Sequence, residues 1–137
     1  MSLIRAKDTK PEKIVRSYLH RAGFRFRLHN KKLPGTPDLW LPRFNAVIFV
    51  NGCYWHRHRD CKLAYTPKQN RCFWEGKFSD NVLRDEQNIS ALLDRGIRIL
   101  IIWECALRTL DGCKENLPKV EEWLLSQSAF METPTRP

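Results

Sequence analysis

A short stretch of this sequence combines residue types that bind metal ions. Cys53, His58 and Cys61 follow the spacing C-x4-H-x2-C, which lets two thiolates and one imidazole converge on a single ion. Zinc closes its structural sites with four such ligands. The candidates for the fourth ligand are the nearby His56 and the other cysteines, Cys72, Cys105 and Cys113. We favour Cys105, because it follows a predicted buried strand at the point where side chains reach the edge of a sheet.

Two carboxylates and another histidine are candidates for catalysis. Asp38 opens a predicted strand, beside a strand that ends at Val50 and Asn51. A carboxylate at a strand end near basic residues suits Mg²⁺, which keeps several waters and needs only one or two carboxylates from the protein. Glu12 lies in the first turn of a predicted helix, where helix capping alone can explain it. His56 either remains on the surface or contacts a phosphate or a proton-transfer site.

Aromatic residues accompany the candidate metal ligands. Tyr54 and Trp55 are adjacent in the same segment, and Trp74 follows further along. Aromatic neighbours in a loop usually pack beneath it. On a basic protein they can instead stack on bases or wedge into a duplex. The sequence leaves both roles open.

The elements that position these residues follow from the hydrophobic periodicity. A helix begins after Thr9 and ends at Gly23, which are typical capping residues. Residues 24–28 alternate with period two, which predicts a half-buried strand. Short strands follow at residues 38–41 and 46–50. The second of these is an unbroken apolar run, which indicates a strand buried on both faces.

The second half of the chain becomes regular again after residues 51–71, which show no periodicity. A predicted helix over residues 79–96 precedes a buried strand over residues 97–103, and a final helix covers about residues 117–125. A helical crossover between two buried strands implies that the strands are parallel. The element order therefore predicts an α/β fold, with a mixed sheet of about four strands flanked by helices.

The composition fits one domain with a basic surface. We expect a single domain over residues 1–125 and a polar, frayed tail over residues 126–137. Lys and Arg number 24 against 15 Asp and Glu, and the net charge of +9 favours either nucleic acid or an acidic membrane surface as partner. The sequence shows neither a signal-peptide core nor an apolar run that could span a bilayer. We therefore expect a cytoplasmic protein with reduced cysteines and no membrane association.

Four segments carry a resemblance to a known family. They are L-P-G-T-P-D at residues 33–38, V-I-F-V-N-G-C-Y-W-H at residues 47–56, residues 81–85, and I-I-W-E-C-A-L at residues 101–107. In this order they resemble the very-short-patch repair (Vsr-type) DNA mismatch endonucleases, over roughly residues 8–125. The resemblance implies a restriction-endonuclease-like core with a zinc-stapled loop. It also implies an enzyme that uses Mg²⁺ to nick one strand of duplex DNA beside a T:G mismatch, in the repair of deaminated 5-methylcytosine.

The resemblance assigns roles to individual residues. Asp38 and the backbone carbonyl of Val50 match the family's Mg²⁺ ligands, and Glu12 matches a glutamate near that metal site. His56 matches a catalytic-site histidine that contacts the scissile phosphate. The residues that match the zinc ligands are Cys53, His58, Cys61 and Cys105. The residues that match the aromatic wedge near the mismatch are Tyr54, Trp55 and Trp74.

Asn51 departs from the family pattern, because the best-studied members carry at this catalytic position a histidine that is a proposed general base. Asn cannot accept a proton at neutral pH, so a metal-activated water or His56 would have to generate the nucleophile. The zinc loop also has one additional residue, Asp60. A loop tolerates such an insertion.

Three functions remain open on the sequence. The first is a mismatch endonuclease that acts as a monomer on mismatched double-stranded DNA, with mismatch-repair proteins as the partners that the family implies. The second is a restriction- or homing-type nuclease domain on the same fold, which would cut both strands of an unmodified duplex. The third is a zinc-stabilised DNA-binding module without catalysis, which Asn51 keeps in consideration.

Overall fold

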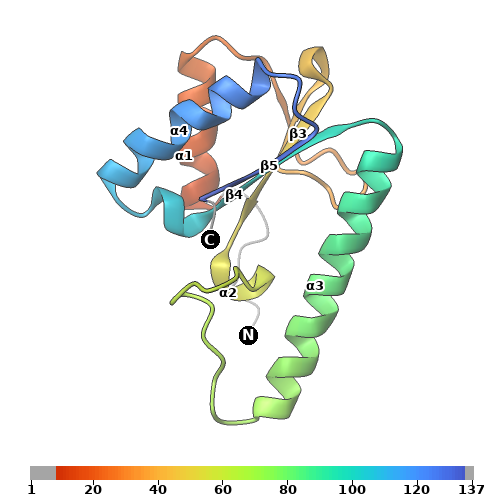
Figure 1. Cartoon of the computed structure of the whole chain (residues 1–137), viewed down its shortest axis with the longest axis vertical. Helices are drawn as coiled ribbons and strands as arrows, with labels where there is room; N and C mark the ends of the chain where they lie inside the picture. The colour runs from red at the N-terminus through yellow and green to blue at the C-terminus, as the bar shows by residue number, and fades with distance from the viewer. Residues whose placement is uncertain (1–8, 135–137) are drawn as a thin grey trace.

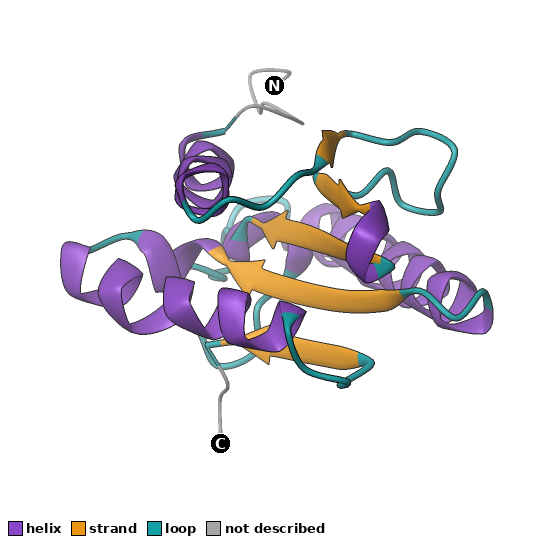
Figure 2. Ribbon diagram, turned by 90° about the horizontal axis from the view of Figure 1, so that it is seen from above, coloured by secondary structure: helices purple, strands orange, loops and turns teal. Residues whose placement is uncertain are grey.

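Alternating side chains of the two central strands point into two separate hydrophobic cores. The computed structural model describes residues 9–134. Ile48 and Leu100 belong to one core, whereas Val47 and Ile99 belong to the other. This alternation is the period-two pattern of strands that are buried on both faces. The sheet therefore lies between helices, as Figure 2 shows.

In the described part of the chain the sheet has five strands, in the order β1-β2-β3-β4-β5. The strands are β1 (Arg27–Leu28), β2 (Leu39–Leu41), β3 (Ala46–Asn51), β4 (Arg98–Trp103) and β5 (Phe130–Thr133). β1, β2 and β3 form antiparallel pairs, whereas β4 runs parallel to β3 and β5 runs parallel to β4.

Within residues 9–134, four helices and two 3-10 turns connect and cover the strands. They are α1 (Lys10–Arg21), η1 (Pro42–Phe44), α2 (Cys53–His56), α3 (Arg71–Asp94), η2 (Glu104–Leu107) and α4 (Leu110–Leu124). The long α3 lies on one side of the sheet, and α1 and α4 lie on the other (Figure 1). None of the helices in residues 9–134 is long and apolar enough to cross a membrane.

The predicted α/β fold with a mixed, helix-flanked sheet is confirmed, although the sheet has five strands rather than about four. The additional strand is β5, so the expected frayed tail is wrong for residues 130–133. Met131 packs against the core, and Thr133 Oγ1 donates a buried hydrogen bond to Asn116 Oδ1 at 2.6 Å. Residues 135–137, also assigned to the tail, lie outside the described residues, as do residues 1–8 of the expected domain.

Several element boundaries also differ from the prediction, for local reasons. α3 starts at Arg71, eight residues before residue 79, because Trp74 and Phe78 give its first turns an apolar face against α2. α4 starts at Leu110, because the Thr109 side chain caps it and accepts from the Gly112 N–H at 2.9 Å. β1 covers only two of the five residues predicted as a strand. α2 lies within the segment predicted to be irregular.

Candidate functional site

The carboxyl end of β3 opens into a cavity of about 620 Å³. Its walls come from the start of α1, the loop at Gly35 and Thr36, the end of β3, and α2. Seven of the predicted site residues line it: Glu12, Asp38, Val50, Asn51, Tyr54, Trp55 and His56. Polar groups that converge in one cavity define the default candidate for a binding or catalytic site.

Asp38 is fixed at the edge of this cavity by the neighbouring strand. Its Oδ2 accepts a hydrogen bond from the backbone N–H of Val50 at 2.7 Å. Burial raises the pKa of Asp38 to about 7, because it disfavours the charged carboxylate. The charge of Glu12 also raises this pKa, whereas the Val50 N–H, His29 and His56 lower it. Asp38 is therefore a carboxylate whose negative charge lacks full compensation from the protein.

Glu12 does more than begin a helix. Its backbone N–H donates to the capping hydroxyl of Thr9 at 3.4 Å, but its carboxylate is only 1% exposed and turns toward the cavity. Glu12 Oε2 lies 3.0 Å from Arg16 Nη1 and 2.6 Å from His29 Nε2. Helix capping alone therefore does not explain this residue.

His29 is a site residue that the sequence reasoning missed. It follows β1 directly, and its backbone N–H donates to the carbonyl of Asp38 at 3.2 Å. This pairing of two neighbouring strands brings the imidazole to Glu12 and Asp38. The signal in the sequence was the alternating segment 24–28, which leads straight into a histidine.

The side chains of Glu12, His29 and Asp38 fit one small cation. One ligand atom from each lies within 4.8 Å of the others. Carboxylate oxygens are the protein ligands that Mg²⁺ prefers, and a nearby positive charge would offset the cost of ionising the partly buried Asp38. Val50 lies beside them, because its N–H is bound to Asp38.

His56 enters the same cavity from the end of α2 and is paired with a residue from α3. Its Nδ1 lies 2.6 Å from Asp85 Oδ2. A carboxylate can only accept at this contact, so the Nδ1 atom carries the proton and Nε2 remains available to a ligand. Asp85 ends one of the segments that carried the family resemblance, but its contact with a residue 29 positions away had no signal in the sequence.

The predicted zinc ligands converge behind α2. One ligand atom from each of Cys53, His58, Cys61 and Cys105 lies within 4.8 Å of the others, and we call these residues the cysteine–histidine cluster. His58 Nδ1 is 3.6 Å from Cys53 Sγ and 3.4 Å from Cys105 Sγ. Tetrahedral zinc, with bonds of about 2.0–2.3 Å, places neighbouring ligand atoms about 3.6 Å apart. The donor set and spacing therefore fit zinc.

The environment of the cysteine–histidine cluster supports this fit. The His58 ring stacks on Trp103, with the ring centroids 4.3 Å apart, which fixes its orientation. Burial and the nearby thiols of Cys105 and Cys61 raise the pKa of Cys53, so the thiolate is disfavoured without a cation. The other candidates for the fourth ligand lie in different surroundings. His56 pairs with Asp85, Cys72 is exposed, and Cys113 contacts the Leu107 carbonyl.

The three predicted wedge residues pack together beside the cavity. Tyr54, Trp55, Trp74 and Phe78 form one aromatic cluster, with neighbouring ring centroids 4.7–6.5 Å apart. Phe78 is buried, but the other three remain partly exposed. The aromatic side chains thus pack on one another, as one of the two predicted roles requires, and still leave an exposed surface that is open to a ligand, as the other requires.

Arg57 ties the loop after α2 to the aromatic cluster. Its guanidinium lies 3.8 Å from the centre of the Phe78 ring and donates to the backbone carbonyls of Tyr54, Ala64 and Tyr65. Because α2 carries Tyr54, Trp55 and His56, this loop and the cysteine–histidine cluster together set the position of the cavity wall.

Comparison with known proteins places these features in a class. A family model described as DNA mismatch endonuclease Vsr matches residues 1–63. The type II nicking enzyme V.XorIIP of Xanthomonas oryzae pv. oryzae is 42% identical over 120 residues, which is 88% of each chain. The DNA mismatch endonuclease Vsr of Escherichia coli K12 is 38% identical over 138 residues, covering 99% of this chain and 88% of the relative.

A third relative, the type II nicking enzyme V.NmeAIP of Neisseria meningitidis serogroup A, is 38% identical over 120 residues, covering 88% of this chain and 85% of the relative. Together with the fold, these similarities define the class: the protein is a DNA endonuclease. The chain belongs to the Vsr family of DNA mismatch endonucleases, as the sequence resemblance predicted. DNA is therefore its substrate.

Proposed function

We propose that this endonuclease uses Mg²⁺ to nick one strand of duplex DNA beside a T:G mismatch, in the repair of deaminated 5-methylcytosine. The observation that carries the proposal is a single cavity bounded by two kinds of group. Asp38, with Glu12 and His29, forms a cation-binding corner, and His56 faces it from α2. The aromatic cluster borders the same opening. This combination suits phosphate chemistry next to a disturbed base pair.

The residues of the cavity divide the work of hydrolysis. A Mg²⁺ ion held by Asp38 and the Val50 carbonyl would supply positive charge to the scissile phosphate and acidify a bound water. Glu12 contacts both Arg16 and His29, and so holds the His29 imidazole beside the proposed Mg²⁺ position. His56, with its ring held by Asp85, presents the Nε2 lone pair to the water beside the phosphate, and after Nε2 has taken up a proton it can donate to a phosphate oxygen. Asn51 is 8% exposed and can contribute hydrogen bonds but cannot take up a proton.

The aromatic cluster provides a physical source of mismatch preference. Wedging Tyr54, Trp55 and Trp74 into a duplex costs a few kcal/mol per unstacked base step. A mismatched pair costs less to open than a Watson–Crick pair. The same insertion is therefore more favourable at a T:G pair, before any base-specific contact is made.

The proposal is tested with three duplexes of one sequence, carrying a T:G pair, a T:A pair or a C:G pair at the same position. We expect a single-strand nick on the T:G duplex that requires Mg²⁺ and leaves the other strand intact. Equal cleavage of matched duplexes would refute mismatch specificity, and cleavage of both strands would favour a restriction-type activity. Binding without a nick in any divalent cation would favour the non-catalytic module.

Asp85→Asn is predicted to reduce nicking by about 10²-fold or more while leaving the melting temperature nearly unchanged. An Asn amide can donate to His56 Nδ1 and so favour the tautomer that leaves Nε2 protonated. Single-turnover nicking of the T:G duplex measures the effect. The matched control is Asp80→Asn, on the same helix but exposed and outside the cavity. Equal rates for the two variants would exclude a role for the His56–Asp85 pair.

The remaining features of the enzyme follow from the same proposal. We propose that the cysteine–histidine cluster holds a structural zinc ion. We further propose that the enzyme acts as a monomer in the cytoplasm, where its DNA substrate and reduced cysteines are expected to be found. Mismatch-repair proteins stay its predicted partners. Size-exclusion chromatography with light scattering measures the molar mass of the protein with and without the T:G duplex, and so tests whether it is a monomer.

A further inference from the structure

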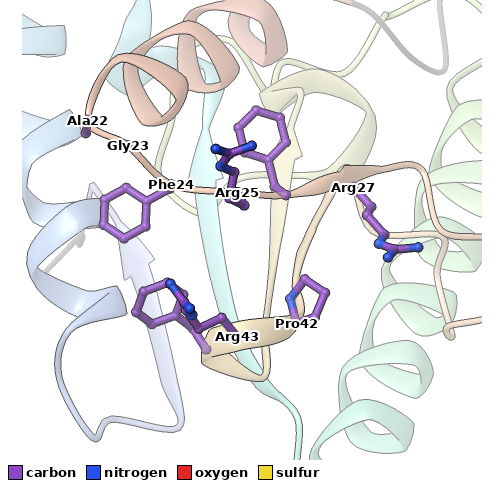
Figure 3. A pocket seen from close by; sticks show the side chains of 9 residues that line it. Ala22, Gly23, Phe24, Arg25, Arg27, Pro42 and Arg43 are labelled. Carbon is purple, nitrogen blue, oxygen red and sulfur yellow. The ribbon is translucent and has the colours of Figure 1, made fainter.

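A second hollow lies at the other end of β2 from Asp38. Its volume is about 580 Å³, and its lining comes from two short segments, residues 22–27 and residues 42–44. Figure 3 shows Arg25 and Arg27 on one segment and Arg43 on the other, across an open space. We call these three residues the arginine row. The hollow contains no acidic residue, and no ion pair joins the arginine row to an acidic group within residues 9–134.

The floor of the hollow is apolar. Phe24, Phe26 and Phe44 pack against the core beneath it, and the ring centroids of Phe24 and Phe44 are 5.4 Å apart. The arginine row is exposed above this floor. The arginine side chains therefore lie next to aromatic residues that pack on the core.

The arginine row lies within the part of the chain that carries almost all of its excess charge. Residues 1–50 contain 11 Lys and Arg against three Asp and Glu, whereas residues 51–137 contain 13 against 12. Two of the three acidic residues, Glu12 and Asp38, line the catalytic cavity. Residues 9–50 alone contain nine Lys and Arg against these two acidic residues. The surface formed by α1, the segment around β1 and η1 is thus positive, which indicates a polyanion on this side of the molecule.

The arginine row also lies close to the catalytic cavity, as its distance along the chain from His29 shows. Arg27 is two residues and Arg25 four residues before His29, which reaches Glu12 in the site. An extended chain spans at most about 3.6 Å per residue, so Arg25 lies within about 14 Å of His29. One DNA strand carries a phosphate every 3.4 Å along the helix axis, so several phosphates next to a cleaved bond lie within this range.

Charged residues on an edge strand can also serve to prevent unwanted strand pairing. β1 is at the edge of the sheet, so Arg27, which lies on β1, would satisfy that role. That role does not explain Arg25, which precedes β1, or Arg43, which lies on η1 across the hollow. Three guanidinium groups around one opening, with no ion pair to an acidic group in the described part of the chain, are better explained by an anionic ligand.

We propose that the arginine row binds the phosphate backbone of the substrate duplex that flanks the nicked bond. The inference rests on the proposed function for the identity of the substrate, but it concerns a separate surface. Guanidinium groups suit this role, because their planar forks bind phosphate oxygens in pairs. The row anchors the flanking strand and so holds the scissile phosphate in the cavity, without reading base sequence.

The test measures DNA affinity in the absence of Mg²⁺, so that nicking plays no part in the readout. Each phosphate contact contributes about 0.9 to the slope of log affinity against log salt concentration. The double variant R25Q/R27Q should lower that slope by about two and weaken binding about 10- to 100-fold at moderate salt. Arg43→Gln should lower the slope by about one. The matched control K114Q/K119Q removes two exposed charges from α4 and should leave both quantities nearly unchanged.

Trimmed duplexes locate the contact. When the duplex is shortened on the side that reaches the arginine row, wild type and R25Q/R27Q should bind equally, whereas trimming the other side should preserve their difference. An unchanged salt slope in R25Q/R27Q, or an equal fall in K114Q/K119Q, would overturn the proposal and would leave an acidic protein as the alternative ligand. Failure of the proposed function can be distinguished from failure of this inference. The first would appear as a lack of nicking on the T:G duplex, whereas the salt dependence of DNA affinity would still show whether the arginine row contacts phosphates.

Discussion

Asp38→Asn is expected to abolish nicking and, in the same protein, to increase thermal stability at neutral pH. Nicking should fall by at least about 10³-fold, because the site would lose the carboxylate that we propose holds a divalent cation, an interaction worth several kcal/mol. Stability should increase because Asn removes a buried charge. Its side-chain oxygen can still accept the hydrogen bond from the Val50 N–H.

The sign of the stability change follows from the pKa of Asp38. This pKa rises from 3.8 to about 7 in the folded protein, so the folded state binds the proton more tightly than the unfolded state. The free energy of unfolding therefore declines as the pH rises from about 4 to 7 and is constant above that range. A shift of three pKa units corresponds to at most roughly 4 kcal/mol. Asn does not titrate, so its advantage should be absent near pH 4 and complete above pH 7.

Urea denaturation at pH 5 and pH 8 without Mg²⁺ measures the gain in stability, with the exposed Asp80→Asn as control. We expect a larger gain for Asp38→Asn at pH 8 than at pH 5 and no gain for the control. Added Mg²⁺ should stabilise the wild type but not Asp38→Asn, because only the folded wild type binds it. A variant that is less stable at both pH values would contradict the assigned burial cost, and one that still nicks would contradict the metal site.

The sequence predicted those parts of the fold that depend on local signals. The threonine cap at Thr9 and the apolar runs of β3 and β4 appear where expected, because capping and periodicity are encoded within a few residues. β5 was not predicted, because its four residues become a strand only through pairing with β4. The first turns of α3 were missed for a related reason. Their apolar face includes Trp74, which is partly covered through contact with α2.

In the candidate site, too, the residues that are encoded locally could be predicted, whereas those that depend on tertiary contacts could not. Cys53, His58 and Cys61 are close in sequence, and Cys105 could be chosen because a strand end brings it to the same edge of the sheet. His29 and Asp85 act through partners 17 and 29 residues away, and no spacing rule connects them. Such pairs depend on how strands and helices meet, which only the assembled fold shows.

Cys105→Ser is predicted to lose most of the zinc and to lower the melting temperature by about 10 °C. A bound metal contributes its binding free energy to folding, and a loss of about 3 kcal/mol shifts the melting temperature by roughly this amount in a chain of this size. Zinc content per chain and thermal denaturation measure the two effects. Cys72→Ser is the matched control, because Cys72 is exposed and lies outside the cysteine–histidine cluster.

The loss of zinc should also reduce nicking without disturbing the cation-binding corner. Cys53 begins α2 and His56 ends it, so releasing the cysteine–histidine cluster frees the helix that positions His56 and the aromatic residues Tyr54 and Trp55. Glu12, His29 and Asp38 lie on α1 and at the ends of β1 and β2, apart from that helix. We therefore expect Cys105→Ser to retain stabilisation by Mg²⁺ while nicking falls about 10²-fold or more. Loss of both properties together would show that the zinc loop supports the whole fold rather than the cavity wall alone.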